Sequence, residues 1–171
     1  MKLPAGCLLG ALLLGSLLGG CGYRTVLARD PFAGADGVNV VMFANRSYQA
    51  GVEAVLTREL VNELALRTGG RVLPGDQAEL ELTGTVLSYS SSAVSYNAQD
   101  QIREYLLAVT VEATLLERQT RKAIWKGQLT EQQSYPVNPN LALQRNSEEA
   151  AAAKICRTLS EDIWQRIGER F

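Results

Sequence analysis

The chain has 171 residues, with 17 Lys and Arg against 18 Asp and Glu, and it contains no His. This near-balance of charge, without any basic run, is unlike the pattern of a nucleic-acid-binding protein. The absence of His removes the commonest general base and transition-metal ligand, and with them every Ser-His or Cys-His catalytic pair. We therefore expect neither an enzyme nor a protein that holds a metal ion or another cofactor.

The first 20 residues are typical of a secretory signal peptide. Lys2 precedes an apolar stretch from about Leu8 to Leu18, which is shorter than the roughly 20 residues that a transmembrane helix needs. The stretch Leu18-Gly19-Gly20-Cys21 resembles the bacterial lipobox, in which the Cys thiol receives diacylglycerol, the signal is cleaved, and the new amino terminus is acylated. We predict removal of residues 1–20 and lipidation of Cys21.

The predicted anchor indicates where the protein resides. Each buried methylene contributes about 0.8 kcal/mol, so two or more acyl chains hold a protein stably on a membrane. The residue after Cys21 is Gly22, and the absence of Asp there favours the outer membrane over retention in the inner membrane. We therefore predict a lipid-anchored protein of the outer membrane that faces the periplasm.

The rest of the chain is predicted to form one domain behind a spacer. Residues 21–37 are mixed in character and include Pro31, as a spacer between lipid and domain would. Residues 38–171 suffice for a single hydrophobic core. Once Cys21 is acylated, Cys156 is the only thiol left in the mature chain, which excludes an intrachain disulfide and predicts a buried thiol on an apolar helical stripe.

A strand and a helix are the first elements predicted in this domain. Residues 38–43 (VNVVMF) form a short apolar run that predicts a largely buried strand, and residues 44–49 follow as a loop. Apolar residues then recur at helical spacing from about residue 50 to residue 67, and Gly69-Gly70 ends the predicted helix. Its inward stripe comprises Val52, Val55, Leu56, Leu60 and Leu64.

Three strands with alternating apolar residues come next, starting near residue 79, residue 104 and residue 122. A polar bend at 97–101 separates the first two, and a polar turn at 117–120 separates the last two. The predicted inward residues are Leu80, Leu82, Gly84 and Val86; then Tyr105, Leu107, Val109, Val111, Ala113 and Leu115; then Trp125, Gly127 and Leu129. Acidic residues alternate with them, as on a solvated face, so no catalytic pair of carboxylates is indicated.

A long loop over 134–146 and a helix from about Ser147 to Arg170 complete the prediction. Asn146 and Glu149 have the spacing of a capping box, with Asn in the place of the usual Ser or Thr. The predicted buried stripe of this helix comprises Ala152, Ile155, Cys156, Leu159, Ile163 and Ile167.

The order β-α-β-β-β-α predicts an α+β two-layer sandwich. A right-handed crossover places the first two strands parallel, and hairpins make the last three antiparallel, which gives a four-stranded mixed sheet. Both helices have a single apolar stripe, so both should cover the same sheet face. The opposite face carries Thr, Glu, Ser and a few Leu, and is either solvated or placed against another wall.

The chain resembles the lipopolysaccharide-assembly lipoprotein (LptE) family. The resemblance rests on GCGYR at the acylation site, the first strand and helix, REYLLAVTVEATL in the long strand and YPVNPNLALQRNSEEAAAAKI before and into the last helix. Its most telling parts are the Glu-Tyr opening of the long strand and the Asn-Pro-x-x-Ala-Leu approach to the helix. These segments occur in family order and include the lipobox.

The resemblance implies a non-enzymatic partner of the outer-membrane β-barrel LptD. Members of the family lie as a plug inside that barrel, aid its assembly and help lipopolysaccharide reach the outer leaflet. They also bind lipopolysaccharide through basic residues near loop ends. Arg145 falls at one such position, Arg103 is displaced from another, and Lys154 could join a cluster with them.

An alternative is a periplasm-facing α/β lipoprotein that binds other cell-envelope partners without a barrel. The tyrosines at 89, 96, 105 and 135 are expected to make packing or interface contacts under either reading. Co-purification of a large barrel from solubilised outer membrane separates the two.

Overall fold

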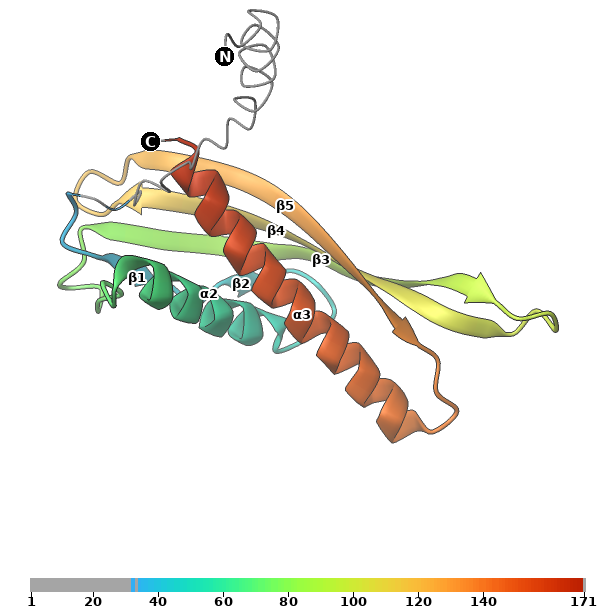
Figure 1. Ribbon diagram of the computed structural model, residues 1–171. Helices are drawn as coiled ribbons and strands as arrows, with labels where there is room; N and C mark the ends of the chain where they lie inside the picture. The colour runs from blue at the N-terminus through green and yellow to red at the C-terminus, as the bar shows by residue number, and fades with distance from the viewer. Residues whose placement is uncertain (1–31, 33, 171) are drawn as a thin grey trace, which may run out of the picture.

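The computed structural model describes Phe32 and residues 34–170, so the predicted signal peptide and Cys21 lie outside the described residues. The elements run in the order β1 (Val38–Val40), β2 (Ala44–Asn45), α2 (Val52–Thr68), β3 (Leu80–Tyr96), β4 (Ile102–Glu117), β5 (Ala123–Pro136) and α3 (Leu141–Gly168). Figure 1 shows one sheet with both helices on the same face. This arrangement confirms the predicted α+β architecture.

The sheet is mixed, as predicted. Its strand order is β1-β3-β4-β5, and β2 also pairs with β3. Both β1 and β2 run parallel to β3, whereas β3, β4 and β5 form an antiparallel meander. The parallel pairing of the strands that flank α2 follows from the crossover helix.

The first predicted strand is not continuous, and the prediction of one strand over 38–43 is wrong. The chain advances four residues from Val40 to Ala44 while their partners on β3, Leu82 and Thr85, are only three apart. The amide of Phe43 leaves the sheet and donates to Thr57 Oγ1 of α2 at 3.1 Å. Its buried ring lies against Gly84, where an added Cβ would collide with it. The sheet therefore has five strands rather than four.

The hydrophobic core lies between the sheet and the two helices. Most of the predicted inward residues of β3 and β4 are buried there, including Leu82, Val86 and the alternating residues from Leu107 to Leu115, whereas Gly84 and Tyr105 are partly buried. From the helices, the fully buried side chains are Leu56, Leu60, Leu64, Ile155, Leu159, Ile163 and Ile167. These residues confirm the main part of both predicted stripes, and replacing one such Leu by Ala costs about 2–5 kcal/mol of stability.

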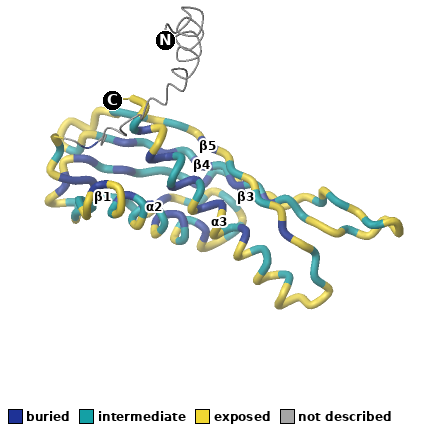
Figure 2. Tube along the Cα trace, in the orientation of Figure 1, coloured by how far each residue is buried: buried dark blue, intermediate teal, exposed yellow. Residues whose placement is uncertain are grey.

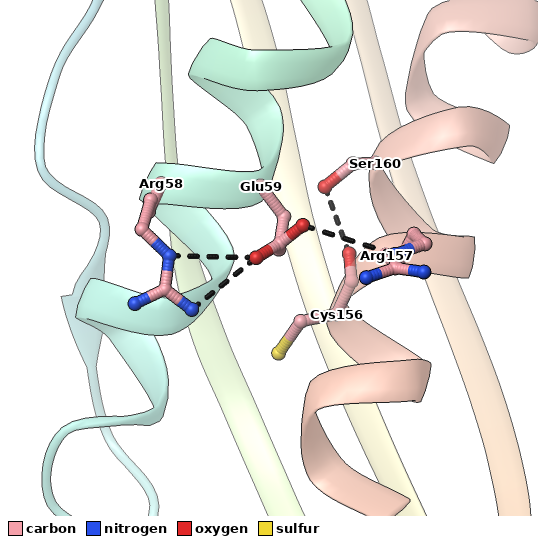
Figure 3. A network of polar contacts seen from close by, with 5 residues as sticks. All are labelled: Arg58, Glu59, Cys156, Arg157 and Ser160. Atoms are coloured by element: carbon pink, nitrogen blue, oxygen red, sulfur yellow. Dashed lines mark hydrogen bonds and ion pairs between the residues drawn. The ribbon is translucent and has the colours of Figure 1, made fainter. Parts of the chain in front are cut away.

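A polar bridge joins α2 to α3 at the edge of the core (Figure 3). The Glu59 carboxylate accepts from Arg58 at 3.2 Å on its own helix and lies 3.9 Å from Arg157 Nε on α3. Cys156 is buried beside this bridge, as predicted, and burial raises the pKa of its thiol to about 12. A thiol with so high a pKa stays protonated and acts as a small apolar side chain.

The last helix begins six residues earlier than predicted. Asn140, not Asn146, is its N-cap, and the Asn140 side chain accepts from the amides of Ala142 and Leu143 at 2.9 and 3.3 Å. Ser147 lies inside the helix, and its hydroxyl donates to the Leu143 carbonyl. Much of the predicted loop is thus helix, because a cap upstream satisfies the first amides before the apolar stripe begins.

A bulge in β3 changes which side chains face the helices. Val86 pairs with Val111 and Ser88 with Thr110, so Leu87 is an extra residue in β3. Beyond it, Tyr89 rather than Ser88 points to the helix side and is buried. The β3–β4 hairpin then continues well past the helices to an exposed tip, as Figures 1 and 2 show.

Candidate partner and ligand surfaces

The sheet face opposite the helices is uncovered by any described element. We call it the open face and define it by nine residues: Glu81, Thr83 and Thr85 on β3, Thr110, Glu112 and Thr114 on β4, and Lys126, Gln128 and Thr130 on β5. None of these residues is buried. The predicted polar face with Thr and Glu is therefore present.

Charges on the open face are largely paired. Lys126 lies 3.0 Å from Glu112, and Arg121 from the β4–β5 turn lies 2.7 Å from Glu81. The hydroxyls of Thr110 and Thr130 are hydrogen-bonded at 2.9 Å. The open face therefore presents polar side chains with little net charge. Such a surface is better suited to contact with another protein than to electrostatic attraction of a polyanion.

Tyrosines hold the hairpin against α3. Tyr89 donates to the Glu148 carboxylate at 2.9 Å, and burial, with this hydrogen bond, raises the pKa of Tyr89. Tyr135 is hydrogen-bonded to Ser91 and stacks on Tyr105 at 5.7 Å. Tyr89, Tyr105 and Tyr135 therefore make packing contacts within the domain, as the sequence predicts. The sequence did not predict the partners themselves, because pairs such as Tyr89 with Glu148 of α3 are brought together only by the fold.

Exposed apolar side chains gather at the end of the domain that holds the hairpin and the start of α3. Val94 and Tyr96 are on β3, and Leu141 and Leu143 are on the first turn of α3, each about half exposed or more. Their spacing of two residues fits no buried helical stripe, so the sequence offered no signal that Leu141 and Leu143 belong to a helix.

Two of the three predicted lipopolysaccharide-binding residues lie at this same end. Arg103 is an extra residue in β4 opposite β3, and its carbonyl accepts from the Val137 amide at 2.9 Å, beside the connection to α3. Arg145 is exposed in the second turn of α3. Neither guanidinium has an ion pair within the described residues, so both are free to reach a ligand.

Lys154 is placed apart from Arg145. Nine residues of α-helix advance about 13 Å and turn the side chain by about 180°, so the two cations point to opposite sides of α3. Lys154 instead lines a groove of about 310 Å³ between β5 and α3, together with Tyr135, Pro136 and Ser147. A cluster of Arg145 with Lys154 is therefore not formed.

Two further observations limit the chemistry of the described residues. No three His, Cys, Asp or Glu side chains in this part of the chain are grouped so that they could hold a metal ion. No helix formed by residues 34–170 is both long and apolar enough to cross a membrane.

The fold is shared with solved proteins of low sequence identity. Rare lipoprotein B from Shewanella oneidensis is 19% identical with a TM-score of 0.50, covering 74% of this chain and 93% of its own. Lipoprotein B from Nitrosomonas europaea is 14% identical with a TM-score of 0.50, over 77% and 82% of the two chains. The PelC dodecamer from Paraburkholderia phytofirmans is 16% identical with a TM-score of 0.52, over 77% and 88%.

The family assignment rests on the amino-acid sequence. No curated protein sequence matches it significantly. The family model described as "LptE: Lipopolysaccharide-assembly" matches residues 35–167, from just before β1 almost to the end of α3. Because this match spans both helices and all five strands, the chain belongs to the LptE lipopolysaccharide-assembly family.

Proposed function

We propose that this protein is a non-enzymatic subunit of an outer-membrane machine that places lipopolysaccharide in the outer leaflet. In this role it lies as a plug inside an LptD-type β-barrel and aids the assembly of that barrel. The observation that carries the proposal is the family match over residues 35–167. The open face supports it, because a barrel interior would provide the wall that this face lacks in the isolated domain.

Anchoring is the second part of the proposal. Cys21 carries diacylglycerol on its thiol and an acyl chain on its amino group, and these groups hold the protein on the periplasmic side of the outer membrane. Gly22 at the following position supports this location over the inner membrane. The family and its lipoprotein relatives support an envelope lipoprotein in general terms.

Lipopolysaccharide binding is the third part, and Arg145 is its leading residue. Lipid A carries phosphates, and a guanidinium can bind a phosphate through two parallel hydrogen bonds. Arg145 and Arg103 are exposed at the end of the domain where apolar side chains are also exposed. Phosphate-binding cations beside apolar side chains fit the two chemical parts of lipid A.

Site-specific photocrosslinking in cells tests the plug. We expect a photoreactive residue at Thr110 or Glu112 on the open face to crosslink to a large outer-membrane barrel. The same residue at Leu60, which is fully buried under the helices, should give no crosslink. Leu66 is a matched exposed control, since it is 79% exposed on α2, away from the open face.

The outcomes separate the proposals. Crosslinks from Thr110 to soluble periplasmic proteins alone would refute the plug and support the alternative of a lipoprotein that binds other envelope partners. Equal crosslinks to the barrel from Thr110 and Leu66 would leave the plug standing but refute a special role for the open face.

A further inference from the structure

A second cationic surface lies at the opposite end of α3 from Arg145. A pocket of about 520 Å³ opens there between the end of α3 and the start of β5. It is lined by Ala123, Ile124, Trp125, Lys126, Arg166, Glu169 and Arg170. Its volume is within the range of small-ligand sites. The lipopolysaccharide proposal makes no use of these residues.

The charge available in this pocket comes from Arg166 and Arg170. Arg166 is in the last turn of α3 and Arg170 lies two residues past its end, and both are exposed and line the pocket. Within the described residues neither makes an ion pair with a carboxylate. Glu169 is the single acidic lining residue, and the Lys126 ammonium is already 3.0 Å from Glu112. The pocket thus presents two guanidinium groups that form no ion pair within the described residues, against one carboxylate, that of Glu169.

Trp125 gives the same pocket an amphipathic wall. Its indole lies against Gly127, where an added Cβ would be 2.5 Å from the ring, so the glycine leaves the room that the ring occupies. The ring is partly exposed. A Trp beside Arg side chains is the combination found where proteins meet the headgroup layer of a membrane, because the ring has an apolar body and a polar edge.

The chain enters the domain beside this pocket. The Phe32 ring packs edge-on against Trp164 of α3 at 5.5 Å. Trp164 is six residues before Arg170, about 9 Å along the helix axis, whereas Leu141 at the other end is about 35 Å away. Eleven residues connect Cys21 to Phe32 and can span at most about 40 Å. A connection of that length reaches either end of the domain, but an anchor at Cys21 is attached to the domain at Phe32, so on average the end that holds Trp164 and Arg166 lies nearer the membrane.

We propose that Arg166, Arg170 and Trp125 bind the phosphate headgroup of an anionic phospholipid in the leaflet that holds the anchor. This inference rests on the proposed lipidation of Cys21. The two arginines bind the phosphodiester oxygens, and Trp125 packs on the glycerol at the headgroup level. The contact fixes the tilt of the domain on the membrane, with the hairpin and Arg145 directed away from the leaflet.

Titration of the purified lipidated protein in neutral detergent tests the site. The ligand is dihexanoylphosphatidylglycerol, with dihexanoylphosphatidylcholine as the zwitterionic comparison, and the signal is Trp125 fluorescence, identified by its loss in Trp125→Phe. We expect phosphatidylglycerol to bind at least about tenfold more tightly than phosphatidylcholine, since each Arg near an anionic lipid surface contributes roughly fivefold and the pocket has two.

Variants locate the binding. We expect Arg166→Glu with Arg170→Glu to weaken phosphatidylglycerol binding by about tenfold or more. The matched control, Arg46→Glu with Arg58→Glu, reverses two exposed charges that have no proposed role in binding and should leave binding within about twofold. If the charge reversals unfold the last turn of the helix, the milder pair Arg166→Gln with Arg170→Gln tests the same prediction. Circular dichroism measures whether each variant keeps its helix content.

Four results would overturn the inference. They are equal binding of the two phospholipids, unchanged binding by the folded Gln variants, displacement of phosphatidylglycerol by equimolar inorganic phosphate, and tighter binding of lipid A than of phosphatidylglycerol at Trp125. The last two would identify a free anion or lipopolysaccharide as the source of the phosphate. Labelling of Cys21 with palmitate and the Thr110 crosslinks are measured separately, so failure of the proposed function is distinguishable.

Discussion

Arg145 is the residue on which the lipopolysaccharide proposal depends most. We expect Arg145→Asp to weaken binding of lipopolysaccharide to the purified protein by up to about fivefold, the range of an exposed charge pair, and Arg145→Lys to weaken it less. Added salt should weaken wild-type binding in the same direction. Equilibrium binding at low and high salt measures both effects.

Lys122 supplies the matched control for this prediction. It is exposed in the β4–β5 turn, at the opposite end of the sheet, so Lys122→Asp makes the same charge change away from Arg145. Equal losses from both variants would mean that net charge, not Arg145, governs binding. An unchanged affinity for a folded Arg145→Asp variant would make this arginine a solvated surface residue.

Glu131 on β5 is a second residue with a measurable consequence. Burial, with the adjacent Asp162 carboxyl of α3, raises the pKa of Glu131 above its ordinary value of 4.5. A carboxyl whose pKa is raised by folding stabilises the fold when protonated, below about pH 4.5, and this contribution is lost as the pH rises through the folded pKa. Above that folded-state pKa, the ionised Glu131 carboxylate lies beside the Asp162 carboxyl.

We therefore expect Glu131→Gln to stabilise the protein at pH 7.5, by less than about 1 kcal/mol because the pair is partly solvated. The difference from wild type should vanish near pH 4. Urea denaturation at both pH values measures it. Glu149→Gln, at an exposed position on α3, removes the same charge away from this pair and serves as the control. A stabilisation by Glu131→Gln of equal size at both pH values would contradict the assignment to this pair.

At the scale of elements, the early start of α3 is the feature most open to test. We expect Asn140→Ala to cost about 1 kcal/mol of local helix stability, because two amides lose their acceptor. Asn146→Ala places a better helix former in an exposed interior turn and should be neutral or slightly stabilising.

Hydrogen exchange of the amides at 144–147 measures this difference. Faster exchange in Asn140→Ala alone supports the cap at Asn140. Faster exchange in Asn146→Ala instead would restore the later helix start that the sequence favours.

The elements that sequence predicted well are those with an unbroken apolar period. Both helices, and the alternating residues of β4, bury one side against the core, so their spacing records the fold directly. The first turns of α3 bury nothing, and exposed Leu141 and Leu143 have no helical spacing. Leu87 and the break before Ala44 insert one residue each, and a period of two cannot reveal an insertion without the partner strand.

For the candidate ligand-binding residues, the sequence predicted solvent exposure but not how the residues are arranged around a site. Polar neighbours indicated that Arg145 is solvent-exposed, and it is. Whether Arg145 and Lys154 act together depends on where α3 begins. Their spacing defines an angle around the helix axis only if α3 already includes residue 145. The pocket at Arg166 combines residues from both ends of the β5–α3 segment, a juxtaposition that chain order alone does not give.

The whole molecule has two chemically different ends. Phe32, Trp164 and the Arg166–Arg170 pocket mark the end where the chain enters. The hairpin, the exposed start of α3 and Arg145 mark the other (Figure 1). In our proposals the first end meets the leaflet and the second meets lipopolysaccharide, with the open face against the barrel along the side.

Strand order also determines when each part of the molecule can form. β3, β4 and β5 are joined by short turns, whereas β1 pairs with β3 across about 40 residues, a closure that costs more chain entropy. We expect the meander to fold first and to template the parallel strands, so Val111 should gain amide protection before Val41 in pulsed exchange during refolding. The first strand is then made early in synthesis but is among the last elements to dock. If Cys21 is lipidated as we propose, the newly anchored chain is joined to its anchor through a strand that stays unpaired until β3 provides the edge that receives it.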